Sequence, residues 1–327
     1  MLARCLTPSA VRAVKIARKQ LKWLIMNNKL KSSLRALAAV TALTLLAPMA
    51  PLAQAAAPKA RFLKDESPAV DETPYVQTAP QVVDAMLKIA GVRGTDFIID
   101  LGSGDGRIPI TAAKMFGTRG FGVEHDPRLV DASNARAKRE GVAERVSFVK
   151  QDLFMTDLSP ATVVSMYLLP DNNLALRPRI LKMLRPGARV VSHDYDMGDW
   201  KPDVEMKVPV PDKPVGVEKA SKVFLWIIPA RMDGTWKFAQ PRPDGGVSQV
   251  ELDFKQHFQE LSGVARVDGR EVAIERAFLQ GMYLSFRISD GANTFRYQGY
   301  ATAGRIKGEV ANGSRTAPWR AIKAGEG

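Results

Sequence analysis

One stretch decides the fold of this 327-residue chain: Asp100-Leu101-Gly102-Ser103-Gly104-Asp105-Gly106-Arg107. It continues a short apolar run that begins at Phe97, which is typical of a buried parallel strand. The three glycines let the backbone turn sharply and approach a ligand closely, because they carry no Cβ atom. A helix expected over 106–116 would present free N–H groups at its start. The stretch therefore predicts a ligand-binding turn between a strand and a helix.

Strands and helices alternate on both sides of this turn. Before it, apolar residues at helical spacing predict a helix that begins near Pro80 and ends at Gly91. After it, we expect strands at 120–124, 146–149, 161–169 and 188–192, helices at 127–140 and 172–184, and further strands at 204–208 and 223–228. This alternation predicts an α/β fold with a Rossmann-like parallel sheet and helices on both of its faces.

The pattern changes after about residue 231. Three tight-turn dipeptides recur at a constant spacing, namely Asp268-Gly269, Asp290-Gly291 and Asn312-Gly313, and Gly281 and Gly304 lie between them. This spacing fits two strands per interval and predicts an antiparallel meander that closes toward a small barrel or a curved sheet. A chance run of hairpins is the alternative. In the barrel, Trp236 and Trp319 are expected in the core, whereas Trp200 is expected in a lid or in the core of the sheet.

The chain therefore divides into four expected parts: a targeting segment (1–57), a linker (58–73), an α/β domain (74–231) and a β-rich domain (232–327). The first part has nine Lys or Arg residues and no acidic residue. A basic stretch, a short apolar run over 36–47 and the sequence Ala53-Gln54-Ala55 predict an export signal. The protein is then exported, periplasmic or membrane-associated. An uncleaved membrane anchor and a mitochondrial transit peptide remain alternatives.

The distribution of charge and cysteine excludes several classes of function. The net charge is +13, but beyond residue 57 only 38 basic residues face 34 acidic ones. Nucleic acid is therefore not an expected partner. Cys5 is the only cysteine and lies in the targeting segment, so thiolate catalysis and cysteine-based metal sites are not expected. The three histidines have no metal-ligand spacing, and no metal is expected.

The glycine spacing distinguishes between two classes of cofactor. A dinucleotide-binding G-x-G-x-x-G would need glycine where the chain has Arg107, which disfavours a nicotinamide oxidoreductase. The pattern D/E-x-G-x-G-x-G instead resembles that of seven-strand methyltransferases that use S-adenosyl-L-methionine, over about residues 74–230.

The resemblance implies roles for individual residues. Glu124 would accept hydrogen bonds from both ribose hydroxyls, which suits a bidentate carboxylate. Asp152 would lie near the adenine, and Asp100 would orient the loop and the amino end of the cofactor. The full expected cofactor-binding set is Tyr75, Thr78, Asp100, Gly102, Ser103, Gly104, Asp105, Gly106, Glu124, Asp152 and Leu153.

Two further segments restrict the resemblance to one group within the seven-strand methyltransferases. They are Pro74-Tyr75-Val76-Gln77-Thr78 and Tyr167-Leu168-Leu169-Pro170. Both look like segments of the lysine methyltransferases that act on the c-ring protein of mitochondrial ATP synthase, and of their bacterial relatives. The resemblance implies a protein-lysine substrate. Tyr167, Pro170 and Asp171 are expected at the catalytic site, because they follow the fourth strand at the carboxyl edge of the sheet. Other polar residues expected at the carboxyl ends of the strands are Asn172, His193, Asp194, Tyr195 and Asp196.

Two other functions remain open. The β-rich domain could shape an apolar pocket for a small molecule or lipid that receives the methyl group. Alternatively, the chain could be a non-catalytic binding protein of the cell envelope that keeps the same fold. The sequence also leaves association with the membrane open.

Overall fold

The computed structural model describes residues 75–327 except 215, 243–244, 292 and 326–327. The predicted targeting segment (1–57) and linker (58–73) lie outside the described residues. Within the described part, no helix has both the length and the hydropathy of a membrane span. The same residues contain no cluster of three or more His, Cys, Asp or Glu side chains suited to a metal ion.

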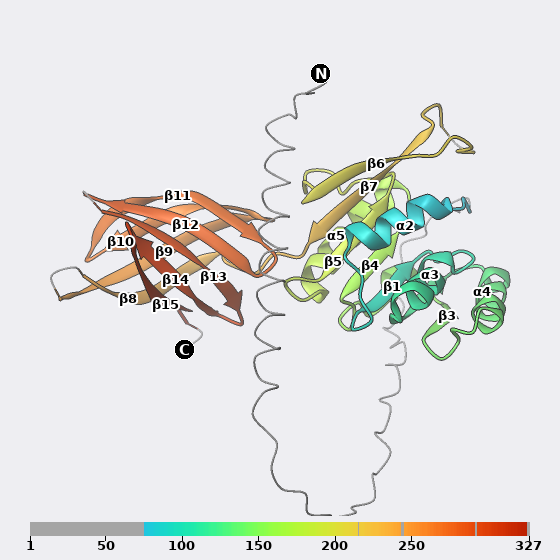
Figure 1. Cartoon of the computed structure of the whole chain (residues 1–327), viewed down its shortest axis with the longest axis horizontal. Helices are drawn as coiled ribbons and strands as arrows, with labels where there is room; N and C mark the ends of the chain where they lie inside the picture. The colour runs from blue at the N-terminus through green and yellow to red at the C-terminus, as the bar shows by residue number, and fades with distance from the viewer. Residues whose placement is uncertain (1–74, 215, 243–244, 292, 326–327) are drawn as a thin grey trace, which may run out of the picture. The chain divides into compact units, whose positions relative to one another are not determined.

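The first half of the described chain forms an α/β sheet (Figure 1). Its helices are α2 (Pro80–Ile89), α3 (Arg107–Phe116), α4 (Pro127–Arg139) and α5 (Pro170–Met183), with a short 3-10 helix η1 (Leu153–Met155). Its strands are β1 (Phe97–Leu101), β2 (Arg119–Glu124), β3 (Val146–Lys150), β4 (Val163–Met166), β5 (Arg189–His193), β6 (Val204–Pro209) and β7 (Ala220–Ile227). The strand order β3-β2-β1-β4-β5-β7-β6 confirms the Rossmann-like seven-strand sheet.

Two expectations about this sheet are wrong. Strands β1 to β5 are parallel, but β7 pairs antiparallel with both β5 and β6. The edge is antiparallel because β6 and β7 follow each other without the helical crossover that parallel strands need. The fourth strand is also shorter than 161–169, since Leu169 already caps α5 and Pro170 occupies its first turn.

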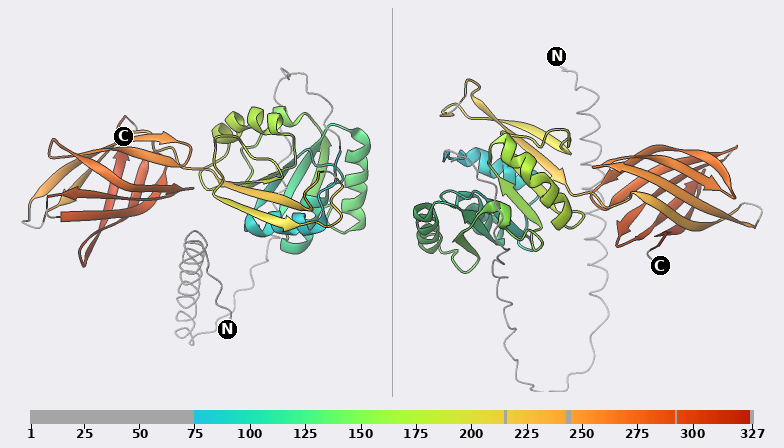
Figure 2. Two further views of the ribbon diagram at one scale, coloured as in Figure 1. Left: turned by 90° about the horizontal axis from the view of Figure 1, so that it is seen from above. Right: turned by 180° about the vertical axis from the view of Figure 1, so that it is seen from behind.

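Helices cover both faces of the sheet, as predicted (Figure 2). Successive residues of β1 point to opposite faces. Ile98 packs in one core with residues of α2 and α3, whereas Ile99 and Leu101 pack in another with residues of α5. Trp200 is fully buried in the second core, which confirms a core position. This packing fixes the carboxyl end of β1, where the glycine-rich turn begins.

The second half of the described chain is a closed antiparallel barrel. Its strands are β8 (Gly234–Pro241), β9 (Val247–His257), β10 (Glu260–Val267), β11 (Arg270–Gln280), β12 (Tyr283–Asp290), β13 (Asn293–Thr302), β14 (Arg305–Asn312) and β15 (Arg315–Lys323). All five predicted turn glycines lie between strands and have positive φ angles. The barrel closes because β15 pairs with β8. The predicted meander and its closure are therefore confirmed.

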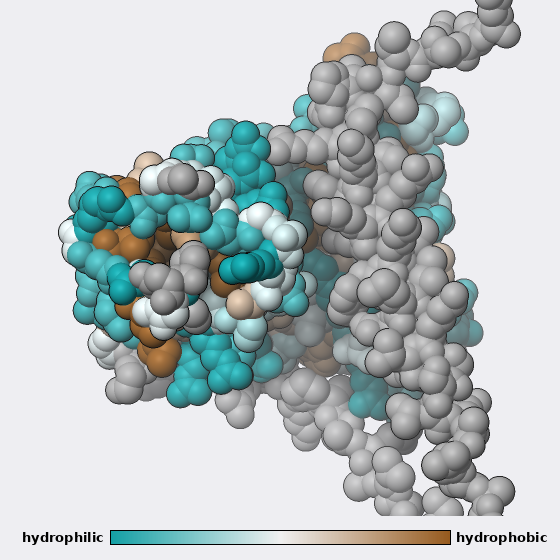
Figure 3. Space-filling view, turned by 60° about the vertical axis from the view of Figure 1, so that its left-hand side comes forward, coloured by the Kyte–Doolittle hydropathy of each residue, from teal (hydrophilic) through white to brown (hydrophobic). Residues whose placement is uncertain are grey.

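Aromatic side chains fill the interior of the barrel. Trp236 and Trp319 are both buried, as predicted. The ring of Trp319 lies 5.1 Å from that of Tyr297 and 5.2 Å from that of Phe238, measured between ring centroids. Burial of a tryptophan among such neighbours stabilises a fold by about 3–5 kcal/mol relative to alanine. The outer wall is mostly hydrophilic, and apolar side chains show at the end of the barrel (Figure 3).

Candidate cofactor and substrate site

A cavity of about 910 Å³ lies at the carboxyl ends of β1, β2, β3 and β4. This volume falls in the range typical of sites for small ligands. The structure brings together at this cavity all but one of the residues predicted to bind cofactor, together with Tyr167. Those that line it are Tyr75, Thr78, Asp100, Gly102, Ser103, Gly104, Asp105, Glu124, Asp152, Leu153 and Tyr167. The exception is Gly106, which is absent from the lining.

The glycine-rich turn follows the conformation that its sequence predicts. Gly102, Gly104 and Gly106 have φ angles of 71°, 52° and 74°, which side-chain-bearing residues rarely adopt. A Cβ atom at Gly104 would lie 2.4 Å from Cε2 of Tyr75. Gly106 instead caps α3, and a Cβ atom there would collide with the ring of Phe148. Gly106 therefore shapes the turn from behind, while Gly102 and Gly104 face the cavity.

Glu124 connects β2 to the turn. Its Oε2 accepts a hydrogen bond from the backbone N–H of Gly104 at 2.8 Å. Its Oε1 accepts from the backbone N–H groups of His125 at 2.7 Å and Asp126 at 3.1 Å. The carboxylate thus has a fixed orientation at the mouth of the cavity. Because each carboxylate oxygen has two acceptor positions, Glu124 keeps one free position, on Oε2, for a ligand hydroxyl.

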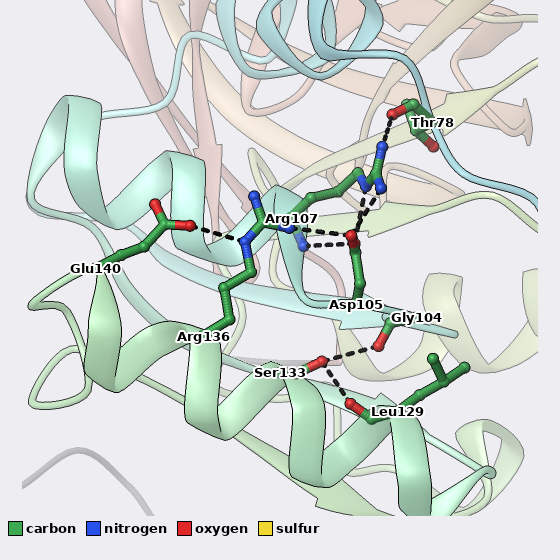
Figure 4. Close-up of polar contacts among 8 residues, drawn as sticks. All are labelled: Thr78, Gly104, Asp105, Arg107, Leu129, Ser133, Arg136 and Glu140. Atoms are coloured by element: carbon green, nitrogen blue, oxygen red, sulfur yellow. Dashed lines mark hydrogen bonds and ion pairs between the residues drawn. The ribbon is translucent and has the colours of Figure 1, made fainter.

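Asp105 supports the turn through two arginines (Figure 4). Its Oδ2 lies 2.7 Å from Nη2 of Arg107 and 3.0 Å from Nη1 of Arg136. Burial raises the pKa of Asp105, but the hydrogen bonds and charges of the two arginines outweigh it and hold that pKa below its ordinary value. Arg107 also donates to the backbone carbonyl of Thr78 at 2.6 Å. This network ties the segment before α2 to the glycine-rich turn.

Asp100 is the most strongly perturbed carboxyl group at the cavity. It is only 2% exposed, and Ser165 Oγ donates a hydrogen bond to it at 2.7 Å. Burial raises its pKa to about 8, and the nearby charges of Glu124 and Asp105 act in the same direction. At neutral pH this carboxyl is therefore mostly protonated in the ligand-free protein. A cation bound beside it would favour the ionised form.

Several buried polar atoms fit a nucleoside ligand. Within the described residues, Ser103 Oγ and both amide atoms of Gln151 are buried and have no hydrogen-bond partner. Both residues line the cavity. Asp152 uses Oδ1 to cap η1 by accepting from Phe154 N at 2.7 Å. Because buried polar groups are normally satisfied, Ser103 and Gln151 are suited to the polar atoms of S-adenosylmethionine. Sequence analysis missed Gln151, although it directly precedes Asp152.

The residues predicted to be catalytic do not all face the cavity. Tyr167 lines it, whereas Pro170 and Asp171 are exposed in the first turn of α5 and are not among the lining residues. Asn172, the next residue, is buried and does line the cavity. Asp171 is therefore a solvent-exposed acid in the first turn of α5, where its negative charge interacts favourably with the helix dipole.

The ring of His193 packs against the ring of Tyr167. The two ring centroids are 3.9 Å apart. The Nδ1 atom of His193 lies 3.1 Å from Thr78 Oγ1, and its Nε2 atom lies 2.9 Å from Ser221 Oγ. Burial lowers the pKa of His193 to about 4, so the ring is neutral at pH 7. Its hydroxyl partners fix the orientation of the ring, which gives it a packing role beside Tyr167.

Asp194 joins Tyr167 to an ion pair that sequence analysis did not anticipate. Its Oδ2 lies 2.8 Å from Nζ of Lys213, which comes from the connection between β6 and β7. Asp194 has a φ angle of 60° and its Oδ1 accepts from Lys222 N at 2.9 Å. Burial and the Asp194 carboxylate raise the pKa of Tyr167 to about 12. The phenol therefore stays protonated at neutral pH.

Tyr195 and Asp196 contribute backbone atoms at this end of the sheet. Their carbonyl oxygens accept hydrogen bonds from Nδ2 of Asn173, at 3.2 and 3.1 Å. The Asp196 side chain caps its own turn by accepting from Gly198 N. Neither residue lines the 910 Å³ cavity. Asn173 is thus a buried organising residue that the sequence pattern, an ordinary helix start, did not reveal.

Comparison with known proteins gives a consistent result. Residues 100–204 match the model of the ANTKMT methyltransferase domain. The chain is 45% identical over 140 residues to the protein-lysine N-methyltransferase of Saccharolobus islandicus, a match that covers 42% of this chain and 87% of that protein. It is 34% identical over 132 residues to the adenine nucleotide translocase lysine N-methyltransferase of Mus musculus, covering 40% of this chain and 57% of that protein.

Among solved structures, the chain is similar to an RNA methyltransferase from Salinibacter ruber in complex with S-adenosyl-L-homocysteine. The two chains are 48% identical, the match covers 48% of this chain and 96% of the other, and the TM-score is 0.43.

Proposed function

Because the chain belongs to the family of S-adenosylmethionine-dependent methyltransferases that includes the protein-lysine N-methyltransferase of Saccharolobus islandicus, we propose that it methylates lysine side chains of a protein. The observation that carries this proposal is the 45% identity over nearly the whole length of that relative. Residues 100–204, which match the ANTKMT methyltransferase domain, contain the glycine-rich turn, and the cavity lies at that turn. On sequence grounds alone, we also propose that residues 1–57 direct the protein to the cell envelope.

The side chains at the cavity have complementary tasks in this reaction. When bound, S-adenosylmethionine supplies a methyl group on a positively charged sulfonium. Glu124, Ser103 and Gln151 would hold the nucleoside, and Asp100 would face the amino end. A lysine nitrogen must be neutral to attack, so its proton has to leave before the N–C bond forms. That proton leaves to solvent, and the protein's contribution is to orient the neutral nitrogen.

Tyr167 is the side chain placed to orient the incoming amine. Its phenol is protonated at neutral pH, so it cannot act as an ionised base. It interacts with the Asp194 carboxylate, which leaves the lone pairs of its oxygen free to accept a hydrogen bond from the substrate nitrogen. Tyr167 is therefore proposed as an orienting group, and Pro170 and Asp171 as supports of the helix that follows it.

Product analysis tests the proposed substrate class. The protein is incubated with methyl-labelled S-adenosylmethionine and fractionated cell extract, and the labelled protein is hydrolysed to amino acids. We expect the label in methylated lysine, at a level that Glu124→Ala reduces to background. Label in the organic phase would instead establish a lipid or small-molecule substrate. Cofactor binding without any transfer would establish the non-catalytic alternative.

Replacing Tyr167 with phenylalanine tests the orienting role. The variant keeps the ring that packs on His193 but loses the hydroxyl. Loss of one hydrogen bond to a charged or partly charged nitrogen should lower kcat by about 10- to 100-fold. The Kd for S-adenosylmethionine should change less than about twofold, since the phenol is not proposed to bind the nucleoside.

Tyr195→Phe is the matched control for this substitution. It also removes a phenol hydroxyl, from a residue outside the cavity lining. The Tyr195 ring is stacked on that of Tyr167, with 6.2 Å between the ring centroids. We expect its kcat to equal that of the unmodified protein. An equal loss in both variants would show that the hydroxyl of Tyr167 has no specific task.

A further inference from the structure

The outer wall of the barrel has a marked charge asymmetry. In the closed strand order, β12, β13, β14 and β15 are consecutive neighbours and form one half of the wall (Figure 1). These four strands carry seven basic residues and two acidic ones: Arg287, Arg296, Arg305, Lys307, Arg315, Arg320 and Lys323 against Asp290 and Glu309. Strands β8 to β11 carry five of each. We call the first half the basic wall.

Among the described residues, the cations of the basic wall form no ion pair with an acidic side chain. Lys307 and Arg320 are direct cross-strand neighbours, as are Arg287 and Arg296. Like charges in such positions are destabilising. Within the part of the chain that the structure describes, Arg305, Lys307 and Arg320 make no ion pair, whereas Arg266 and Arg270 of the other half pair with Glu271 and Asp290. This arrangement costs stability and favours an external anion.

Exposed aromatic and apolar side chains adjoin these cations. Tyr283 pairs across the strands with Tyr300, Tyr300 with Lys307, and Lys307 with Arg320. Tyr300 is 57% exposed, and its ring centroid lies 5.6 Å from that of Tyr283. Phe278 is 44% exposed and packs against Tyr283. Ile322, 49% exposed, pairs with Arg305. Neighbouring cross-strand rows thus combine apolar side chains with cations that make no ion pair among the described residues.

We propose that the basic wall binds the surface of an anionic phospholipid membrane. Arginine and lysine would contact lipid phosphates, and Tyr283, Tyr300, Phe278 and Ile322 would enter the headgroup region. A single-stranded nucleic acid is the less suitable occupant, because the Tyr283 and Tyr300 rings meet edge to face at 66° and offer no parallel faces for successive bases. This inference is independent of the proposed lysine substrate, because it concerns a separate surface.

A vesicle-binding experiment tests the proposal on the full chain. The probes are vesicles of phosphatidylglycerol with phosphatidylcholine, and vesicles of phosphatidylcholine alone. The variant Arg305→Gln/Lys307→Gln/Arg320→Gln should bind the anionic vesicles about 100-fold more weakly than the unmodified chain, from the usual contribution of three basic residues. Tyr300→Ser/Phe278→Ser should lose the part of the binding that persists at high salt, since that part is not electrostatic.

A second triple variant provides the matched control. Lys255→Gln/Arg266→Gln/Arg276→Gln removes the same charge from β9, β10 and β11 and changes no residue or ion pair of the basic wall. It should bind the anionic vesicles within about threefold of the unmodified chain. Equal losses in the two triple variants would overturn the proposal. So would unchanged vesicle binding together with lost binding of a labelled single-stranded oligonucleotide. Methyl transfer to a soluble acceptor, measured in parallel, reports that each variant is folded.

Discussion

Replacing Glu124 with alanine is expected to lower the affinity for S-adenosylmethionine by at least about 100-fold. Two contributions are lost together. The carboxylate is the predicted acceptor for the ribose hydroxyls, and it also holds the N–H groups of Gly104, His125 and Asp126. Its removal therefore takes away ligand contacts and releases the turn that forms one side of the cavity. Calorimetric titration with S-adenosylmethionine measures the effect directly.

Glu144→Ala is the control for this loss of charge. Glu144 is exposed and lies outside the cavity lining, so its removal should leave the Kd unchanged. Thermal unfolding of both variants without ligand separates binding from folding. An affinity of Glu124→Ala within about threefold of the unmodified protein would contradict the role assigned to this residue.

Replacing Asp100 with asparagine should have opposite effects on stability and on binding. The folded pKa is about 8, against an ordinary value of 3.8, because the carboxyl is buried near other acids. A raised pKa means that this group favours the folded state below about pH 4 and that the benefit is lost as the pH rises to 8. The asparagine variant cannot ionise. Without ligand, it should therefore be more stable than the unmodified protein at pH 8–9.

The affinity for the cofactor should change with pH in the opposite direction to the folding stability. A positively charged ligand favours the ionised carboxylate, so the affinity of the unmodified protein should increase as the pH rises toward 8. Asp100→Asn should bind more weakly by about 10- to 100-fold at pH 8, without that increase. Asp131→Asn, at an exposed position of α4, is the control and should match the unmodified protein. A pH-independent affinity in the unmodified protein would remove Asp100 from the proposed site.

Local rules predicted much of this fold because they act over short distances. The turn glycines at 269, 291 and 313 need positive φ angles, and dipeptides that favour such angles fixed the register of the barrel hairpins. The antiparallel edge of the sheet was not predicted, because an apolar strand looks the same in either direction. The missing helix between β6 and β7 was the available signal.

The sequence predicted the part of the site that depends on local spacing, as it did for the fold. Glu124 and the glycine-rich turn lie close together in sequence, and their type and spacing carry the information. Lys213 reaches Asp194, and Arg136 reaches Asp105, only through the tertiary fold. A single Lys or Arg in a polar segment does not indicate from sequence which acidic residue it will contact. The same holds for Gln151, whose importance depends on being buried without a hydrogen-bond partner.

The closure of the barrel has a consequence for how the chain matures. The seam joins β8 and β15, the first and last strands of the barrel, through the pairs Ile322 with Lys237 and Lys323 with Trp236. During synthesis β8 therefore leaves the ribosome long before its partner exists. Non-local pairing of this kind is slow and leaves strand edges open to other chains. The barrel can consequently close only after β15 has been synthesised, and nascent chains are most prone to aggregate before β15 emerges.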